Sequence, residues 1–184
     1  MANTSLSDHV MVIADALAPA RCAALIERFE SSSDQEPCQR ENGHSFVQLD
    51  ITQHWPDENN ALIPVFLDCF KQYQFATKAA FWPPKFAFEH LRIKRYLPNG
   101  RDSFPTHVDV MCHDAARRFM TAIVYLNETD GGETVFPNLD LVVEPEAGKC
   151  IAFPPLWMFP HAGRPPRSRP KYILHTYLCY PAVN

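Results

Sequence analysis

A histidine and an aspartate one residue apart, His107 and Asp109, are the first side chains in this sequence with a clear capacity to bind a metal ion. On a β-strand, residues i and i+2 point to the same face, so both side chains can reach one ion while Val108 points away. The pair alone is not specific, because the same residues also occur at strand ends with both side chains in solvent.

A third metal ligand is available at His161, in the segment WMFPHAG. Two imidazoles and one carboxylate on one face of an octahedron leave three positions open for a chelating cosubstrate and dioxygen. This is the ligand set of non-haem Fe(II) oxygenases. Catalytic zinc also uses two histidines and a carboxylate, so zinc is the alternative metal.

Five segments between Tyr96 and Tyr180 resemble, in the correct order, the catalytic core of Fe(II)- and 2-oxoglutarate-dependent oxygenases of the prolyl 4-hydroxylase type. The matching segments are HVD at 107–109, RRFMTAIVYLNE at 117–128, GGETVFP at 131–137, EPEAGKCIAF at 144–153 and HAGRPPRSRPKYIL at 161–174. The resemblance implies that His107, Asp109 and His161 bind Fe(II).

The resemblance also implies a cation that pairs with the distal carboxylate of 2-oxoglutarate, at a set interval after the second histidine. Lys171, ten residues after His161, matches that interval. Arg169 is the rival, because the same strand phase would point it to the same side two residues earlier. A buried ion pair is tolerated here because each partner supplies the other's counter-charge.

Three further residues have both a functional and a structural interpretation. Tyr96 resembles a family tyrosine that hydrogen-bonds the cosubstrate, and it is also explained as an ordinary core tyrosine. Arg118 could hold a substrate or product carboxylate, or it could be a surface arginine beside Arg117. Trp157 could line a substrate pocket, or it could only pack beside the barrel mouth.

The reaction implied by the resemblance is hydroxylation of a C–H bond with release of succinate and CO2. Its cofactors are Fe(II), 2-oxoglutarate and dioxygen, and ascorbate is a possible addition. Related halogenases replace the ligand carboxylate by a small residue, so Asp109 favours hydroxylation. The substrate is a small metabolite, an amino acid or a peptidyl residue, and we expect the segments 31–60, 97–106 and 111–118 to contact it.

Two other classes of protein remain open. One is a zinc hydrolase or other metal enzyme on the same ligands, and the other is a non-catalytic jelly-roll binding module. Lys171 argues against both, since neither needs a dicarboxylate anchor. The residues Ser168, Arg169 and Pro170 replace a segment in which prolyl hydroxylases usually have a glycine, which weakens the assignment to a true prolyl hydroxylase.

The elements that must position these residues form an α+β pattern. The sequence predicts a strand at 10–15, an amphipathic helix at Pro19–Glu30, a polar loop at 31–44, a strand at Ser45–Ile51, a helix from Asn60 to about Lys78, and many short strands thereafter. We expect one domain, 1–184, with a helical support region and short strands at 1–84 and the catalytic core at 85–184. The resemblance implies that this core is a double-stranded β-helix, or jelly roll, braced by the N-terminal helices.

Composition and charge restrict the partners. The net charge is −4, so there is no basic excess for nucleic-acid binding, and the basic cluster Arg164–Lys171 is interpreted as a solvated loop. We see no signal peptide and no apolar run of the ~18–20 residues that a membrane span requires. The six cysteines are scattered, which predicts free thiols and a cytoplasmic location. His113 is interpreted as a loop residue and His175 as a core residue or a neighbour of the ligands. The sequence does not indicate an oligomeric state.

Overall fold

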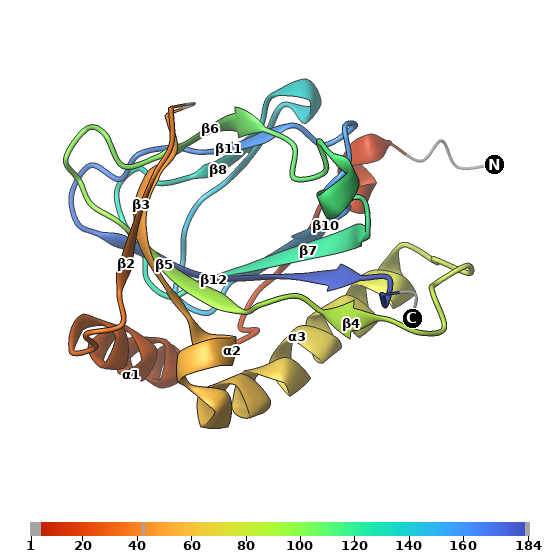
Figure 1. Cartoon of the computed structure of the whole chain (residues 1–184). Helices are drawn as coiled ribbons and strands as arrows, with labels where there is room; N and C mark the ends of the chain where they lie inside the picture. The colour runs from red at the N-terminus through yellow and green to blue at the C-terminus, as the bar shows by residue number, and fades with distance from the viewer. Residues whose placement is uncertain (1–4, 42, 183–184) are drawn as a thin grey trace.

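Two antiparallel β-sheets face one another, and helices pack against the outer side of the larger sheet (Figure 1). The computed structural model describes residues 5–41 and 43–182. In that part of the chain the larger sheet has the order β1 (Met11–Ile13), β10 (Cys150–Phe153), β7 (Arg118–Tyr125), β12 (Lys171–Cys179), β5 (Arg92–Tyr96), β3 (Ser45–Asp50) and β2 (Glu36–Gln39), with β4 (Ala87–Phe88) also beside β12. The smaller sheet has the order β6 (Phe104–His107), β11 (His161–Gly163), β8 (Thr134–Phe136) and β9 (Leu141–Val143). Mixed helices and facing antiparallel sheets are the α+β jelly-roll arrangement that was expected.

Alternation along the central strands divides the core into two layers. Met120, Ala122 and Val124 of β7 face the helices, whereas Ile123 and Tyr125 face the smaller sheet. The two-residue period of a strand produces this division, since successive side chains point to opposite faces. A strand buried on both faces therefore supports the helices with one face and lines the interior of the jelly roll with the other.

The helices are α1 (Pro19–Glu30), α2 (Ile51–His54) and α3 (Pro56–Ala76). Proline at the first position of α1 and α3 suits the helix start, because its missing N–H would have no partner there. The sequence predicted that the second helix begins at Asn60, but α3 begins at Pro56, because a proline is favourable at the first position of a helix. Arg28 of α1 donates to Asp57 and Glu58 in the first turn of α3, at 3.1 and 3.3 Å, which ties the two helices together.

Several predicted boundaries were wrong. The polar segment 31–44 contains the edge strand β2, because pairing with β3 overrides its composition. β6 ends at His107, so Asp109 lies beyond the strand, and His161–Gly163 is a strand that the sequence did not predict. Strands β1, β2 and β3 come from the first 84 residues, and they extend the larger sheet, whose other strands come from residues 85–184. The short 3-10 helices are η1 (Leu6–His9), η2 (His113–Ala115) and η3 (Pro137–Leu139), so His113 begins η2.

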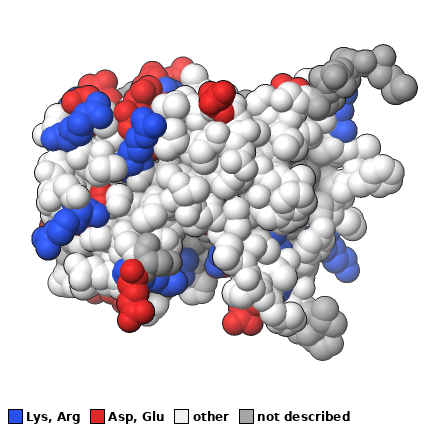
Figure 2. Space-filling model, turned by 90° about the horizontal axis from the view of Figure 1, so that it is seen from above, with Lys and Arg blue, Asp and Glu red and all other residues white. Residues whose placement is uncertain are grey.

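The face seen from above carries both signs of charge toward one end and is largely uncharged in its middle (Figure 2). In the basic cluster, Arg167 pairs with Asp130 at 2.6 Å and Arg169 pairs with Glu128 at 3.1 Å. All six cysteines are free thiols. No helix in the described part of the chain has the length and apolar character needed to cross a bilayer.

Candidate metal centre and cosubstrate pocket

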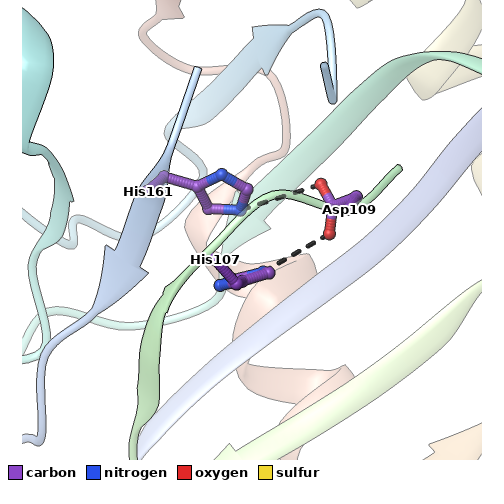
Figure 3. A group of neighbouring side chains, drawn as sticks. All are labelled: His107, Asp109 and His161. Atoms are coloured by element: carbon purple, nitrogen blue, oxygen red, sulfur yellow. Dashed lines mark ion pairs between the residues drawn. The ribbon is translucent and has the colours of Figure 1, made fainter. Parts of the chain in front are cut away.

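The side chains of His107, Asp109 and His161 converge between the two sheets (Figure 3). His107 ends β6 and His161 begins β11, and these two residues lie opposite each other in the antiparallel pair. Asp109 follows two residues after β6, in a turn held by a hydrogen bond from the amide of Val110 to the carbonyl of Pro155, at 3.2 Å. The possible ligand atoms of all three side chains lie within 4.8 Å of one another.

Both histidines present the same ring nitrogen to the centre. The Nδ1 atom of His107 lies 2.8 Å from the carbonyl of Pro105, and that of His161 lies 3.1 Å from the carbonyl of Phe159. A carbonyl accepts only from a protonated nitrogen, so Nδ1 carries the hydrogen and Nε2 keeps its lone pair for a metal. The Nε2 atoms lie 3.4 Å and 3.7 Å from the carboxylate oxygens of Asp109.

The surroundings of the Asp109 carboxylate favour the binding of a cation. Its Oδ1 atom accepts a hydrogen bond from the Tyr177 hydroxyl at 2.8 Å, while its buried Oδ2 atom has no hydrogen-bond partner among the described residues. An unpaired buried oxygen is costly unless a positive charge satisfies it. Two imidazole nitrogens and this carboxylate are donors that bind divalent metals, and they lie close enough together to share one ion.

The protonation states of the cluster also suit metal binding. Burial alone would raise the pKa of Asp109, but the neighbouring His107 and His161 imidazoles, which attract the carboxylate when they are protonated, lower it below its usual value. Burial lowers the pKa of His161 to about 4. At neutral pH the carboxylate is therefore ionised and the His161 imidazole is neutral, which are the forms that ligate metals.

A cavity of about 40 Å³ lies beside the three candidate ligands, and both Lys171 and Tyr96 line it. Lys171 begins β12 and is 2% exposed, and its partner across the sheet is Tyr96 of β5. The Lys171 ammonium donates to the carbonyl of Gly132 at 3.0 Å and lies 4.5 Å from the centre of the Tyr96 ring. A Cβ atom on Gly132, which has a φ of +79°, would lie 3.0 Å from the Lys171 chain, so the glycine makes room for the lysine.

Arg169 does not reach this cavity, contrary to the alternative that its strand phase suggested. Its side chain is 56% exposed and pairs with Glu128 at the surface. β12 begins at Lys171, so the alternation of the strand does not extend back to residue 169. Trp157 is 76% exposed and lines neither cavity described here, whereas its neighbour Phe159 is buried in the inner core.

A second cavity of about 940 Å³ adjoins the candidate ligands His107 and Asp109, and Arg118 lines it. The Arg118 guanidinium makes two hydrogen bonds to the Glu89 carboxylate, at 2.8 and 2.5 Å, and one to the carbonyl of Asp109, at 3.3 Å. It also lies over the ring of Tyr177, 4.1 Å from the ring centre. These contacts hold Arg118 in place beside the carboxylate ligand. All three segments expected to contact substrate contribute to the lining of this outer cavity: 31–60 and 111–118 through several residues each, and 97–106 through Phe104.

Sequence reasoning missed Lys94 altogether and did not assign a role to Tyr177. Both follow from strand alternation: Lys94 precedes Tyr96 by two residues on β5, and Tyr177 follows Lys171 by six residues on β12. The same alternation places His175 in the interior, where it lines both cavities. Extending the phase of Tyr96 and Lys171 along their strands would have found Lys94 and Tyr177, and the interior position of His175 was expected from the sequence.

Comparison with known proteins identifies the family. Residues 91–179 match the model of the 2OG-Fe(II) oxygenase superfamily. A putative prolyl 4-hydroxylase from Acanthamoeba polyphaga mimivirus is 30% identical over 145 residues, which cover 68% of this chain and 56% of the relative. The chain thus spans little more than half the length of that relative. The chain belongs to the 2OG-Fe(II) oxygenase superfamily and is of the prolyl 4-hydroxylase-like type.

Solved structures show the same fold. A viral collagen prolyl hydroxylase from Paramecium bursaria Chlorella virus-1, in complex with 2-oxoglutarate, matches with a TM-score of 0.67 and 24% identity, over 95% of this chain and 97% of that one. A prolyl 4-hydroxylase from Pseudomonas putida matches with a TM-score of 0.70 and 22% identity, over 96% and 97%. A Trichoplax adhaerens prolyl hydroxylase, in complex with a hypoxia-inducible factor peptide fragment, matches with a TM-score of 0.74 and 14% identity, over 94% and 84%. The double-stranded β-helix expected from the sequence is therefore confirmed.

Proposed function

We propose that this protein is an Fe(II)- and 2-oxoglutarate-dependent dioxygenase that hydroxylates a C–H bond. His107, Asp109 and His161 would hold the iron, and Lys171 with Tyr96 would bind the distal carboxylate of 2-oxoglutarate. The observation that carries the proposal is the presence, in one small cavity, of a three-ligand metal cluster and a buried lysine. A zinc hydrolase or a binding module on the same fold has no use for that lysine.

The residues of the chain have separate tasks. With both bound, the iron would activate dioxygen as the four-electron oxidant; the decarboxylation of 2-oxoglutarate to succinate and CO2 would supply two of the electrons, and the substrate C–H bond that becomes C–OH would supply the other two. Backbone carbonyls orient the two histidines, and Tyr177 orients Asp109. The Lys171 ammonium provides the counter-charge for a dicarboxylate in a site from which water is largely excluded.

We propose a small molecule or a peptide as the substrate, bound in the outer cavity. The similarity to proteins named prolyl hydroxylases makes a proline in a peptide one class to test. We further propose that the described residues form one domain and that the protein is cytoplasmic, a location supported by its six free thiols.

Anaerobic titration of the purified protein with Fe(II) and 2-oxoglutarate tests the cofactor assignment without knowledge of the substrate. We expect a weak visible metal-to-ligand charge-transfer band that appears only when both are present. The His161→Ala variant is the control and should not form the band. A wild-type protein that binds zinc but never forms the band with Fe(II) would support the zinc alternative and contradict the proposal.

A further inference from the structure

Lys94 is a second buried lysine in the interior of the jelly roll, and no role in metal or cosubstrate binding requires it. It lies on β5, two residues before Tyr96, and it is 7% exposed. Lys94 lines both the inner cavity beside the metal ligands and the large outer cavity. Its position is therefore the junction at which a substrate in the outer cavity meets the metal centre.

The hydrogen bonds around Lys94 leave part of its ammonium group free. The Lys94 Nζ atom lies 2.9 Å from Nδ1 of His175, and Nε2 of His175 lies 3.0 Å from the Thr121 hydroxyl. The Thr121 hydroxyl also lies 3.4 Å from the carbonyl of Thr176, to which it can donate. A neutral His175 that accepts from Lys94 and donates to Thr121 satisfies the whole chain. An ammonium has three N–H donors, and only this one has a protein acceptor among the described residues.

The positive charge of Lys94 also has no ion-pair partner among the described residues. No carboxylate of the described residues lies within 4.0 Å of its ammonium, whereas the two partly buried arginines that line the outer cavity are paired, Arg118 with Glu89 and Arg92 with Asp50. Its remaining close partners are the rings of Phe46 and Phe104, whose centres lie 5.1 and 5.7 Å from Nζ. Aromatic rings compensate a charge only in part, and a buried charge without a counter-ion is costly. An arrangement of this kind is suited to an anion that arrives with a ligand.

The other candidate partners within the protein are already engaged. Asp109 is a metal ligand and accepts from Tyr177. 2-Oxoglutarate has two carboxylates, of which one would chelate the metal and the other would pair with Lys171. Lys94 therefore remains for the substrate. Exposed Arg40 and Arg117 add positive charge around the outer cavity and exposed Asp114 adds one negative charge, whereas Arg92 is paired with Asp50 at 3.7 Å.

We propose that Lys94 binds a carboxylate of the substrate, so that the substrates of this enzyme are carboxylate-bearing compounds. This inference rests on the proposed function, because it assigns the second buried cation after the cosubstrate has taken the first. The carboxylate can belong to a free acid or to an acidic side chain in a peptide. In either form the carboxylate would accept hydrogen bonds from the free N–H groups of Lys94, whose ammonium lies near the rings of Phe46 and Phe104. This contact would hold the substrate close to the metal ligands.

The test uses matched pairs of ligands on the wild-type protein loaded with Mn(II) and 2-oxoglutarate without oxygen. One arm compares N-acetyl amino acids with their C-terminal amides, and the other compares short peptides containing Glu with the same peptides containing Gln. Dissociation constants are measured by ligand-observed NMR. Because charge-assisted hydrogen bonds are among the strongest polar contacts, we expect the preferred acid to bind at least roughly tenfold more tightly than its amide. The arm that shows this preference identifies the source of the carboxylate.

Variants then assign the preference to Lys94. In Lys94→Met and Lys94→Gln the acid and its amide should bind about equally, while the dissociation constant of 2-oxoglutarate changes less than about threefold. Two substitutions are used so that one remains if the other does not fold, as judged by thermal melting. Lys85→Met is the matched control, because it removes the same charge from an exposed position outside both cavities and should leave the preference intact.

Three results would overturn the inference. The first is a wild-type protein that binds amides as tightly as acids in both arms. The second is a preference that survives in both Lys94 variants. The third is a large loss of 2-oxoglutarate binding in those variants, which would place Lys94 in the cosubstrate site. A wild-type protein that does not bind 2-oxoglutarate at all would instead contradict the proposed function, and this is measured before the ligand pairs are added.

Discussion

Replacement of Lys171 by alanine should separate cosubstrate binding from metal binding. The lysine is 2% exposed, and its ammonium contacts the carbonyl of Gly132 and the ring of Tyr96 in the cavity beside the proposed metal ligands. Lys171→Ala removes the one cation that we assign to the distal carboxylate of 2-oxoglutarate. His107, Asp109 and His161 keep their positions, so Fe(II) affinity should stay nearly normal.

The size of the effect follows from burial. Removing one partner of a buried ion pair typically costs ~3–5 kcal/mol, because the other charge is left without compensation. Each ~1.4 kcal/mol corresponds to a tenfold change in affinity. Lys171→Ala should therefore weaken 2-oxoglutarate binding by about a hundredfold or more. The comparison should be made at pH 6.5, because burial lowers the pKa of Lys171 to about 7 and the wild-type lysine is then mostly charged.

Arg169→Ala is the matched control, since it also removes one positive charge close to the start of β12. Its side chain is 56% exposed and pairs with Glu128, and exposed ion pairs contribute only ~0–1 kcal/mol. We expect at most a few-fold change. The assay is anaerobic titration of 2-oxoglutarate into the Fe(II) protein, followed by the charge-transfer band or by calorimetry. A larger effect from Arg169→Ala than from Lys171→Ala would refute the assignment, and small effects from both would undercut the 2-oxoglutarate site itself.

Three other predictions test the ligands, the titration of the site and the fold. His161→Ala should abolish Fe(II) binding and succinate formation, and full decarboxylation of 2-oxoglutarate by this variant would show that the ligand assignment is wrong. Because burial lowers the pKa of Lys171 to about 7 and only the ammonium form pairs with a carboxylate, 2-oxoglutarate affinity should fall above pH 7, by up to about tenfold per pH unit. Calorimetry at pH 8 in two buffers should then show proton uptake, and a constant affinity from pH 6.5 to 8.5 would contradict this. Gly148 has a φ of +85°, and a Cβ added there would lie 2.0 Å from the carbonyl oxygen of Leu17. Gly148→Ala should therefore lower the melting temperature by several degrees, because backbone strain of ~1–3 kcal/mol is added to the clash. Gly100→Ala, with a φ of +71° and open space around it, is the control, and equal melting temperatures for the two variants would argue against the clash.

Much of the candidate site could be predicted because its information is local. His107 and Asp109 are separated by one residue, and Lys171 follows His161 at the interval that the family resemblance implies, so each pairing is visible within a short segment. The alternation of β12 likewise follows from the two-residue period of a strand, which is a property of the backbone alone. The amphipathic helix at Pro19–Glu30 was predicted with correct bounds, because an apolar stripe and a proline at the first position both indicate it.

Two kinds of feature were decided by the tertiary structure: the residue at which a strand begins, and the pairs of strands that become neighbours. Arg169 was a candidate until the start of β12 at Lys171 left it at the surface, and that start depends on pairing with Tyr96 of a strand far away in the sequence. β2 forms from a polar segment only because β3 supplies a partner for its backbone.

The partnership of Lys94 with His175 is the clearest example of what tertiary structure alone decided. The two residues are 81 positions apart, and they meet because β5 and β12 are neighbours in the larger sheet. Residue spacing encodes which face of a strand a side chain occupies. Which strands become neighbours, and in what register, is decided when both faces of a sheet are buried together, and that depends on the whole chain.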